Sequence, residues 1–345
     1  MDFSYSQEHL MTAELAHQIF SDQVDDAFHL QQGAKFAPQL WQTLAEAGLL
    51  GAALSEESGG SALGFIGGCV VLQAMGAVLA PLPLLSATTA AMALDDAGRH
   101  QCAGELASGE SYPVACADSG LLLQGEQVSG TLAHVPFARG ASRLVAVADQ
   151  KLLVIDLTQP GVTLEDQQCT NGLPACQLSL DTRAEIIGGA DAVATLRQRL
   201  QVGTAMLQLG VLEEALRRTA EFTVERKQFG QALARFQAVS QRAANGYIDI
   251  EALRATAESA MWRLHQGLDA TLEAATALWW ASEAGHRVSH TGQHLHGGIG
   301  SDLTYPIHRY FLWAKQLEFS LGGAAHSAAA IGEELAENES LGVRK

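Results

Sequence analysis

The 345-residue chain is short of charge, and above all of positive charge. Only 17% of its residues are charged, and 21 basic against 38 acidic residues leave a formal net charge of −17. This shortage of cations argues against a nucleic-acid-binding protein, which needs a basic surface to neutralise phosphates. With 48% hydrophobic residues, the composition is also not that of a disordered acidic segment, so we expect a large core. So little charge predicts a sizeable subunit interface.

Sequence signals of several other protein classes are missing. The five cysteines form no CxxC pair, which predicts reduced thiols in a cytoplasmic protein. The first ten residues lack a basic segment followed by an apolar run, so no secretory signal is predicted. Residues 58–94 contain no charged residue, but several glycines, Gln73 and two prolines interrupt them. We therefore expect two buried helices, near 61–80 and 84–96, and no membrane span.

Residues 1–110 predict a helical domain. Ser6 is expected to cap an amphipathic helix that continues to about residue 30. Pro38 should open a second helix that ends at Gly48, and a further short helix is expected near 98–108.

Residues 111–187 change character and predict a small, shortened β-domain. Short apolar runs alternate here with turn residues such as Gly125, Gly130 and the pair Asn171-Gly172. The runs that predict strands are 112–117, 121–124, 143–148, 151–157 and 177–180. Because no helices alternate with these strands, a doubly wound nucleotide-binding sheet is excluded, and a small antiparallel sheet or barrel is expected.

Residues 188–345 return to long helices. Ala, Leu and Met recur at spacings of three and four, which is typical of antiparallel bundle packing. The four expected helices are 189–225, 236–267, 269–296 and 305–337. The chain is therefore predicted to be mainly α with a small β-domain, and to divide into three domains at 1–110, 111–187 and 188–345.

Two segments between the expected C-terminal helices carry residues suited to anion binding. The first is ERKQFG (225–230), with FQAVS (236–240) shortly after it, and the second is HLHGGIG (294–300), followed by YPIHR. A guanidinium and uncovered glycine N–H groups can together hold a diphosphate. A salt bridge in a turn and a glycine at a helix end would explain the same residues, so both interpretations stay open at this point.

These segments resemble the acyl-CoA dehydrogenase family. ERKQFG with FQAVS is similar to the family's RKxFG and QAxS pattern, and HLHGGIG with YPIHR is similar to its glycine pair and following YP stretch. The family has an N-terminal helical domain, a central β-domain and a C-terminal four-helix bundle, so the resemblance extends along nearly the whole chain. It implies an acyl-CoA dehydrogenase-like fold and FAD as the cofactor.

In that family the two segments hold the ADP half of an FAD that is bound to the neighbouring subunit. The resemblance therefore implies cofactor contacts from residues of both segments. These residues are Arg226, Gln228, Phe229, Gln237, His294, Gly297 and Gly298. His294 stands where the family has glutamine.

The resemblance fails at the residues that perform the family's reaction. That reaction removes two hydrogens from a CoA thioester: a glutamate takes the proton and flavin takes the hydride. The two positions where family members carry this glutamate correspond to Leu321 and Leu200, and leucine cannot accept a proton. The family's flavin-contacting loop is expected between about 115 and 140, where this chain is shorter and the contacts are not recognisable.

The chain keeps the residues that contact a neighbour's cofactor but lacks the base. By the resemblance, this combination indicates the non-catalytic, small subunit of a heteromeric acyl-CoA dehydrogenase. The expected partner is a catalytic subunit, in a heterotetramer. The resemblance implies α,β-dehydrogenation of a CoA thioester, with an electron-transferring flavoprotein as acceptor. The sequence of the second segment is similar to that of bacterial family members that act on steroid side-chain or ring-fragment thioesters. This resemblance suggests lipid or steroid degradation. No nucleic acid or membrane is expected among the partners.

Two alternative functions stay open. The chain could be a homomeric FAD enzyme with a relocated base, or a non-enzymatic scaffold or CoA-ester binder. Glu318 is the best relocated base, because one helical turn separates it from Leu321. Asp118 and Asp302 are weaker candidates, since each reads more simply as a turn or helix-cap carboxylate.

Other catalytic chemistry finds little support in the sequence. His286, His290 and His294 recur every four residues, but no HExxH pattern accompanies them and no metal site is predicted. The segment around Gly297 does not follow a strand as a dinucleotide GxGxxG would. No GxSxG elbow for a serine nucleophile is present.

Overall fold

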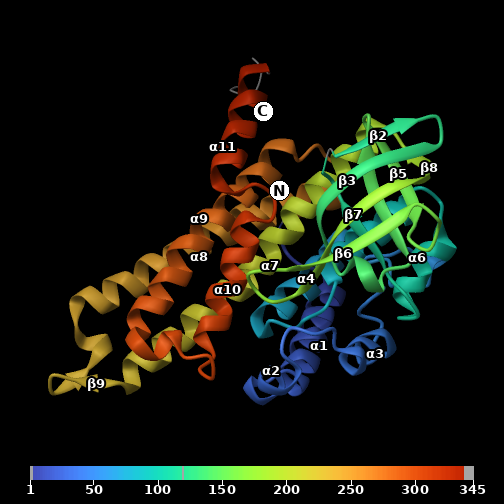
Figure 1. The fold of residues 1–345 in the computed structure, drawn as a ribbon. Helices are drawn as coiled ribbons and strands as arrows, with labels where there is room; N and C mark the ends of the chain where they lie inside the picture. Colours follow the sequence, from blue (N-terminus) through green and yellow to red (C-terminus); the bar gives the residue numbers. More distant parts are fainter. Residues whose placement is uncertain (1–2, 119, 338–345) are drawn as a thin grey trace. The chain divides into compact units, whose positions relative to one another are not determined.

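The computed structural model describes residues 3–118 and 120–337, and Figure 1 shows their helices and strands. These residues form two compact units. One unit comprises residues 4–72 and 80–200, and the other comprises residue 3 together with 73–79 and 201–337. Each unit has its own core and is described by itself.

The first unit begins with helices, as the sequence predicts. They are α1 (Gln7–Gln23), α2 (Asp26–Gln32), α3 (Pro38–Glu46), the greater part of α4 (Gly64–Val78), α5 (Leu84–Asp96) and α6 (His100–Ala107). The Ser6 hydroxyl accepts a hydrogen bond from His9 N, which confirms the predicted cap. The single helix expected to reach residue 30 is wrong, because Asp25 starts α2 by accepting a hydrogen bond from Phe28 N at 2.7 Å.

The charge-free residues 58–94 form two helices, as expected. Most side chains of α4 and α5 are buried, including Phe65, Met75 and Leu94. Within the described part of the chain, no helix has both the length and the apolar character needed to cross a bilayer. The five cysteines are free thiols.

The strands of the first unit form two four-stranded sheets. One has the order β1 (Pro113–Cys116), β4 (Arg143–Ala148), β5 (Lys151–Asp156) and β8 (Glu185–Gly188). The other has the order β2 (Leu121–Gln124), β3 (Gln127–Pro136), β7 (Pro174–Arg183) and β6 (Val162–Gln168). The expectation of one antiparallel sheet or barrel is wrong, and β1 and β4 even pair in parallel. The reason is that the β2–β3 hairpin between them belongs to the other sheet.

Three strands of the first unit were not predicted from the sequence. β6 has the sequence VTLEDQQ and lies at the edge of its sheet, where most of its side chains are at least partly exposed. β3 contains Gly130 and a register shift between Leu132 and Val135, which hide the alternation of apolar and polar residues. β8 has only four residues, which is too short for a pattern to emerge.

The second unit is a helical bundle. Its helices are the part of α7 (Ala190–Glu225) from residue 201, then α8 (Gln237–His265), α9 (Thr271–His296), α10 (Ile307–Phe319) and α11 (Gly323–Glu337). α9 packs against α8, α10 and α11, and these helices can be followed in orange and red in Figure 1. The single helix expected over 305–337 is wrong, because Gly322 and Gly323 take left-handed φ values of 93° and 75° and separate α10 from α11.

Two glycines allow the end of α4 and α7 to touch at backbone distance. A Cβ added at Gly76 would lie 2.2 Å from Leu207 O, and one added at Gly210 would lie 2.0 Å from Gln73 O. Both distances are too short for a side chain at either position unless the facing backbone moves. Beside this contact, Gln73 Nε2 donates a hydrogen bond to Glu213 Oε2 at 2.9 Å.

We expect Gly210→Ala to lower the free energy of unfolding by about 2 kcal/mol or more, because the backbone of α4 would have to move. The matched control is Gly332→Ala in α11, where an added Cβ meets no atom within 4 Å. That change should leave stability unchanged or raise it slightly, since alanine is the better helix former. Urea unfolding followed by circular dichroism compares the two, and equal effects would contradict the assigned helix contact.

Asp95, near the end of α5, links this helix to the segment that follows α3. Asp95 accepts hydrogen bonds from Ser55 N at 2.8 Å, Ser55 Oγ at 2.7 Å, Ser58 Oγ at 2.6 Å and His100 Nδ1 at 2.8 Å. Burial alone would raise the pKa of Asp95, but these hydrogen bonds favour the ionised form and lower the pKa to about 2.

Asp95→Asn should cost about 2 kcal/mol at pH 7, because hydrogen bonds to a charged acceptor are lost. The folded pKa lies below the ordinary value of 3.8, so this stabilisation is present above that value and is lost as pH falls towards about 2. We therefore expect the stability difference between the variant and the parent chain to shrink on acidification. Urea midpoints measured at several pH values test this, and a constant difference would speak against it.

Candidate functional site

The first predicted anion-binding segment forms a tight hairpin after α7. β9 (Lys227–Gln228) pairs with β10 (Gln231–Ala232), and Gln228 lies opposite Gln231. Phe229 and Gly230 make the turn with φ values of 53° and 81°. Two positive φ values are what a two-residue hairpin turn requires, and glycine adopts such a value readily, whereas phenylalanine does so at a cost.

The side chains of this hairpin face outwards. Phe229 is 92% exposed, and its only ring neighbour in the described residues is Phe236, at 6.2 Å between centroids. Arg226 is also exposed and forms no ion pair with any residue that the structure describes. Backbone bonds hold it in place instead: its N–H donates to Phe222 O, and its carbonyl accepts from Leu233 N. A strained, exposed aromatic and a guanidinium with no ion pair indicate a surface made for contact with another molecule.

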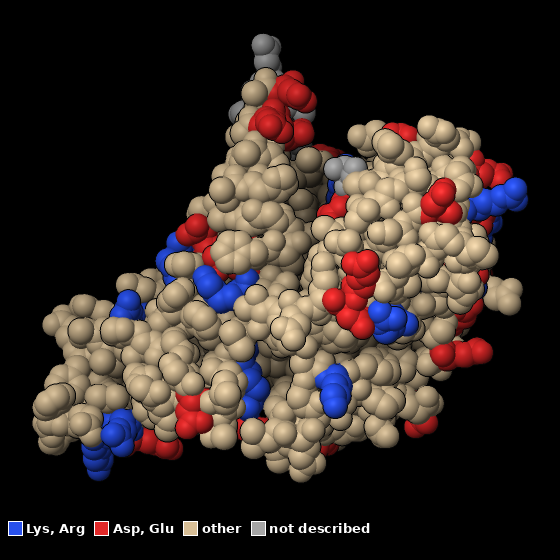
Figure 2. Space-filling model, in the orientation of Figure 1, with Lys and Arg blue, Asp and Glu red and all other residues tan. Residues whose placement is uncertain are grey.

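The hairpin is basic within an acidic chain. Between residues 225 and 235 there are three cations, Arg226, Lys227 and Arg235, and one carboxylate, Glu225. Figure 2 shows basic side chains at the end of the bundle that carries β9, while most of the visible surface is uncharged. Gln237, the first residue of α8, is exposed beside this hairpin in sequence. The charge and the amides suit an anionic ligand.

The second segment forms a glycine turn at the end of α9. Gly297 ends the helix with φ 64°, and its N–H donates to His294 O. Gly298 is the second residue of the short helix η4 (Gly297–Ser301) and has no left-handed φ. A Cβ at either glycine would meet no atom of the described residues within 4 Å. Gly298 is therefore not required by the packing of this chain, and it leaves open backbone for a closely approaching partner or ligand.

The two segments lie at the same end of the bundle. A cavity of about 190 Å³ is lined by the last turns of α7 and by residues on either side of the glycine turn. Phe222 and Glu225, just before the hairpin, face this cavity together with His296 and Tyr305. Glu225 and His296, the sequence neighbours of Arg226 and Gly297, thus line one cavity, whereas Arg226 and Gly297 themselves are not among its lining residues. His294 is exposed on the last turn of α9. Sequence reasoning did not single out His296, which reads as one more residue of a buried helical face.

The positions where the family carries its base hold buried or half-buried leucines. Leu321 lies between α10 and α11, and Leu200 is 7% exposed on α7. Glu318, the relocated candidate, is 8% exposed and is engaged by two neighbours. Lys315 Nζ donates to its Oε2 at 2.6 Å, and His286 Nδ1 lies 3.2 Å from its Oε1. A general base must reach the substrate proton, and this carboxylate is directed to Lys315 of its own helix and to His286 of α9 instead.

The remaining titratable candidates have structural partners. Asp302 accepts hydrogen bonds from Thr304 N and Oγ1, both at 2.8 Å, and these bonds lower its pKa. Asp118 is exposed at the end of β1. The rings of His286 and His290 lie 4.5 Å apart, but no group of three metal-ligating side chains occurs among residues 3–118 and 120–337.

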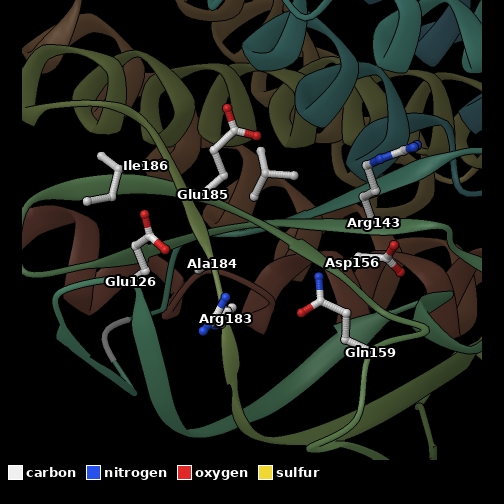
Figure 3. Close-up of a pocket in the computed structure, with 9 residues that line it drawn as sticks. Glu126, Arg143, Asp156, Gln159, Arg183, Ala184, Glu185 and Ile186 are labelled. Atoms are coloured by element: carbon white, nitrogen blue, oxygen red, sulfur yellow. The ribbon is translucent and has the colours of Figure 1, made fainter.

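A larger cavity, of about 490 Å³, lies in the β-sheets of the first unit (Figure 3). Its charged side chains are largely occupied within the protein: Arg143 is bonded to Glu105 at 2.5 Å, and Asp156 accepts from Thr158 Oγ1 at 2.6 Å. Glu185 pairs with Arg99. The sequence carries no pattern that marks this cavity, and its mixture of paired charges favours no ligand class.

Comparison with known proteins gives a consistent result. Residues 6–106 match the family model of the acyl-CoA dehydrogenase N-terminal domain, and residues 188–336 match that of the C-terminal domain. The chain is 36% identical over 339 residues to the acyl-CoA dehydrogenase FadE27 of Mycobacterium tuberculosis, an alignment that covers 88% of this chain and 89% of the relative.

Two solved structures are similar over nearly the full length. A variant of the Tcur3481-Tcur3483 steroid ACAD is 34% identical with a TM-score of 0.92, covering 97% of this chain and 99% of that one. The ChsE4-ChsE5 complex of Mycobacterium tuberculosis is 34% identical with a TM-score of 0.91, covering 98% and 100%.

Proposed function

The chain belongs to the acyl-CoA dehydrogenase family, and from this premise we propose that it is the accessory subunit of a heteromeric enzyme of that family. In this role it donates the Arg226 hairpin and the Gly297-Gly298 turn to an FAD that is seated mainly on a catalytic partner. The enzyme as a whole would oxidise a CoA thioester between its α and β carbons. The three-domain division at 110 and 187 is part of the same proposal.

One contrast carries the proposal: the cofactor-contacting groups are present and exposed, while the usual base positions hold Leu321 and Leu200. Neither the exposed side chain of Arg226 nor the uncovered backbone at Gly298 stabilises the fold of the isolated chain. A homomeric enzyme that used the family's usual base would need a carboxylate at one of the leucine positions. The accessory role accounts for both halves of the contrast.

FAD is the cofactor that the family indicates, and the described residues suit its diphosphate half. Arg226 would supply the charge, Gln228, Gln237 and His294 would supply polar contacts, and the turn at Gly297 and Gly298 would let backbone N–H groups approach. Phe229 offers an exposed ring for an aromatic or apolar surface. When bound, FAD accepts the hydride that leaves the substrate.

Relatives support a heteromeric assembly. One similar structure is a complex of ChsE4 with ChsE5, and another is described as the Tcur3481-Tcur3483 steroid ACAD. On this basis we propose a heterotetramer with a catalytic subunit, a CoA thioester substrate of the steroid type and an electron-transferring flavoprotein as acceptor. The cytoplasmic location predicted from the scattered thiols stays a prediction.

Two alternatives make different predictions. A homomeric enzyme that used Glu318 would need this carboxylate to leave Lys315 and His286, to which it is bonded. A scaffold without cofactor would leave the exposed hairpin unexplained. The accessory role is therefore the function that the geometry supports best.

The colour of the purified protein tests the proposal directly. We expect the chain alone to retain little FAD, and the complex with a co-expressed catalytic acyl-CoA dehydrogenase subunit to be yellow, with flavin absorbance near one FAD per pair of chains. Visible absorbance and acyl-CoA oxidation are measured on both samples. Stoichiometric FAD and oxidation activity in the chain alone would overturn the accessory role and favour the homomeric alternative.

Arg226→Ala in the complex should weaken FAD retention by about 1.5–3 kcal/mol, the worth of a hydrogen bond to a charged group. Arg183→Ala, an equally exposed arginine of the β-domain, is the matched control and should leave FAD affinity unchanged. Equilibrium dialysis of the complex with FAD measures both. Unchanged affinity in the Arg226 variant would remove this residue from the site.

A further inference from the structure

Three aromatic rings connect the two FAD-contacting segments. Phe222 of α7 stacks on His296 of α9, with centroids 4.3 Å apart and planes inclined by 23°. Tyr305 closes the group, with centroids 5.4 Å from His296 and 6.4 Å from Phe222. We call these residues the ring cluster. Such pairs contribute beyond the area they bury, because their geometry is specific.

Each ring is tied to one of the segments. The carbonyl of Phe222 accepts the Arg226 N–H at 2.8 Å, so this ring lies one helical turn before the hairpin. His296 is the last residue of α9 and directly precedes Gly297, so its ring lies at the start of the glycine turn. Tyr305 N donates to Asp302 O at the far end of the same turn. The cluster therefore forms a packed connection between the residues that immediately precede the two segments.

The histidine ring is held in one orientation by a backbone hydrogen bond. Its Nδ1 lies 2.8 Å from Gly292 O, one helical turn back, and donates a hydrogen bond to it. The side chain is 5% exposed, and burial lowers the pKa of His296. Nε2 has no hydrogen-bond partner among the described residues. A buried acceptor without a partner is a cost, so the contribution of this residue to the fold lies in the ring and its orientation.

Because a cavity adjoins the imidazole of His296, the arrangement of the neighbouring helix ends depends on this ring. The cavity of about 190 Å³ lies against the ring cluster, with Arg218 and Glu221 on its wall. Removing the imidazole would enlarge this empty space and would leave Phe222 without its stacking partner. The ends of α7 and α9 could then shift independently of each other.

We propose that His296 is a positioning residue of the cofactor site: by stacking on Phe222 it fixes the Arg226 hairpin relative to the Gly297-Gly298 turn. This inference rests on the proposed function, because it assigns the fixed geometry to FAD retention. His296 itself contacts neither the diphosphate nor the substrate in this assignment. Its ring sets the distance between two groups that do.

The first test uses the chain alone and hydrogen–deuterium exchange. His296→Ala should raise exchange about five-fold in peptides that cover residues 226–236 and 297–305, as expected for one lost aromatic pair. His296→Phe, which keeps the ring, should restore slow exchange in both. Val288→Ala, which removes buried packing from the middle of α9, is the control and should leave these two peptides unchanged. Unchanged exchange in the His296→Ala chain would overturn the proposal.

The second test uses the complex with its catalytic subunit and measures the rate of FAD release. His296→Ala should speed release about five-fold, His296→Phe should bring it back towards the parent rate, and Val288→Ala should have no effect. Faster exchange without faster FAD release would reduce the ring cluster to a structural role and overturn the proposal. If Arg226→Ala releases FAD and His296→Ala does not, only this inference fails. If Arg226→Ala has no effect, the proposed function fails first.

Discussion

Close backbone contact between helices is the constraint on which the second unit depends. Gly76 and Gly210 let α4 and α7 meet with no side chain between them, and Gly285 leaves room for the buried Gln208 amide. Gln208 Nε2 then donates to Ala281 O and Ala314 O, at 3.3 and 3.2 Å, and so joins α7 to both α9 and α10. Helices that pack this closely leave no room for charged side chains between them, which accounts for part of the low charge of the chain.

Rigid packing inside the bundle has a consequence at its end. A hairpin of a few residues cannot order itself, but one residue separates β9 from the end of α7, and β10 leads through the short helix η3 (Leu233–Arg235) into α8. The orientation of the hairpin is therefore set by helices that are held by buried contacts. In the proposed role, Arg226 and Phe229 would therefore be presented to the partner without support from a bound cofactor, and preorganised contacts cost less on binding.

Patterns of apolar and turn residues were sufficient for elements with clear boundaries, such as β2 and β4, whose limits the sequence predicts. They failed where a boundary depends on a single capping residue, as at Asp25, or on two left-handed glycines, as between α10 and α11. The family, its fold and its cofactor could be predicted because short segments such as ERKQFG are specific. The role of His296 could not, because stacking on Phe222 brings together residues from two different helices.

In the proposed accessory role, the loss of a base and the retention of exposed cofactor contacts place different demands on a sequence. A catalytic carboxylate can be replaced by leucine with no cost to folding, because a buried apolar side chain packs well, as Leu200 does. An exposed arginine and a phenylalanine with positive φ gain nothing for the fold, and the second is a cost. Physical stability alone would therefore favour replacing Phe229 and would not require Arg226, so the presence of both residues at one end of the bundle fits the proposed partner that needs them.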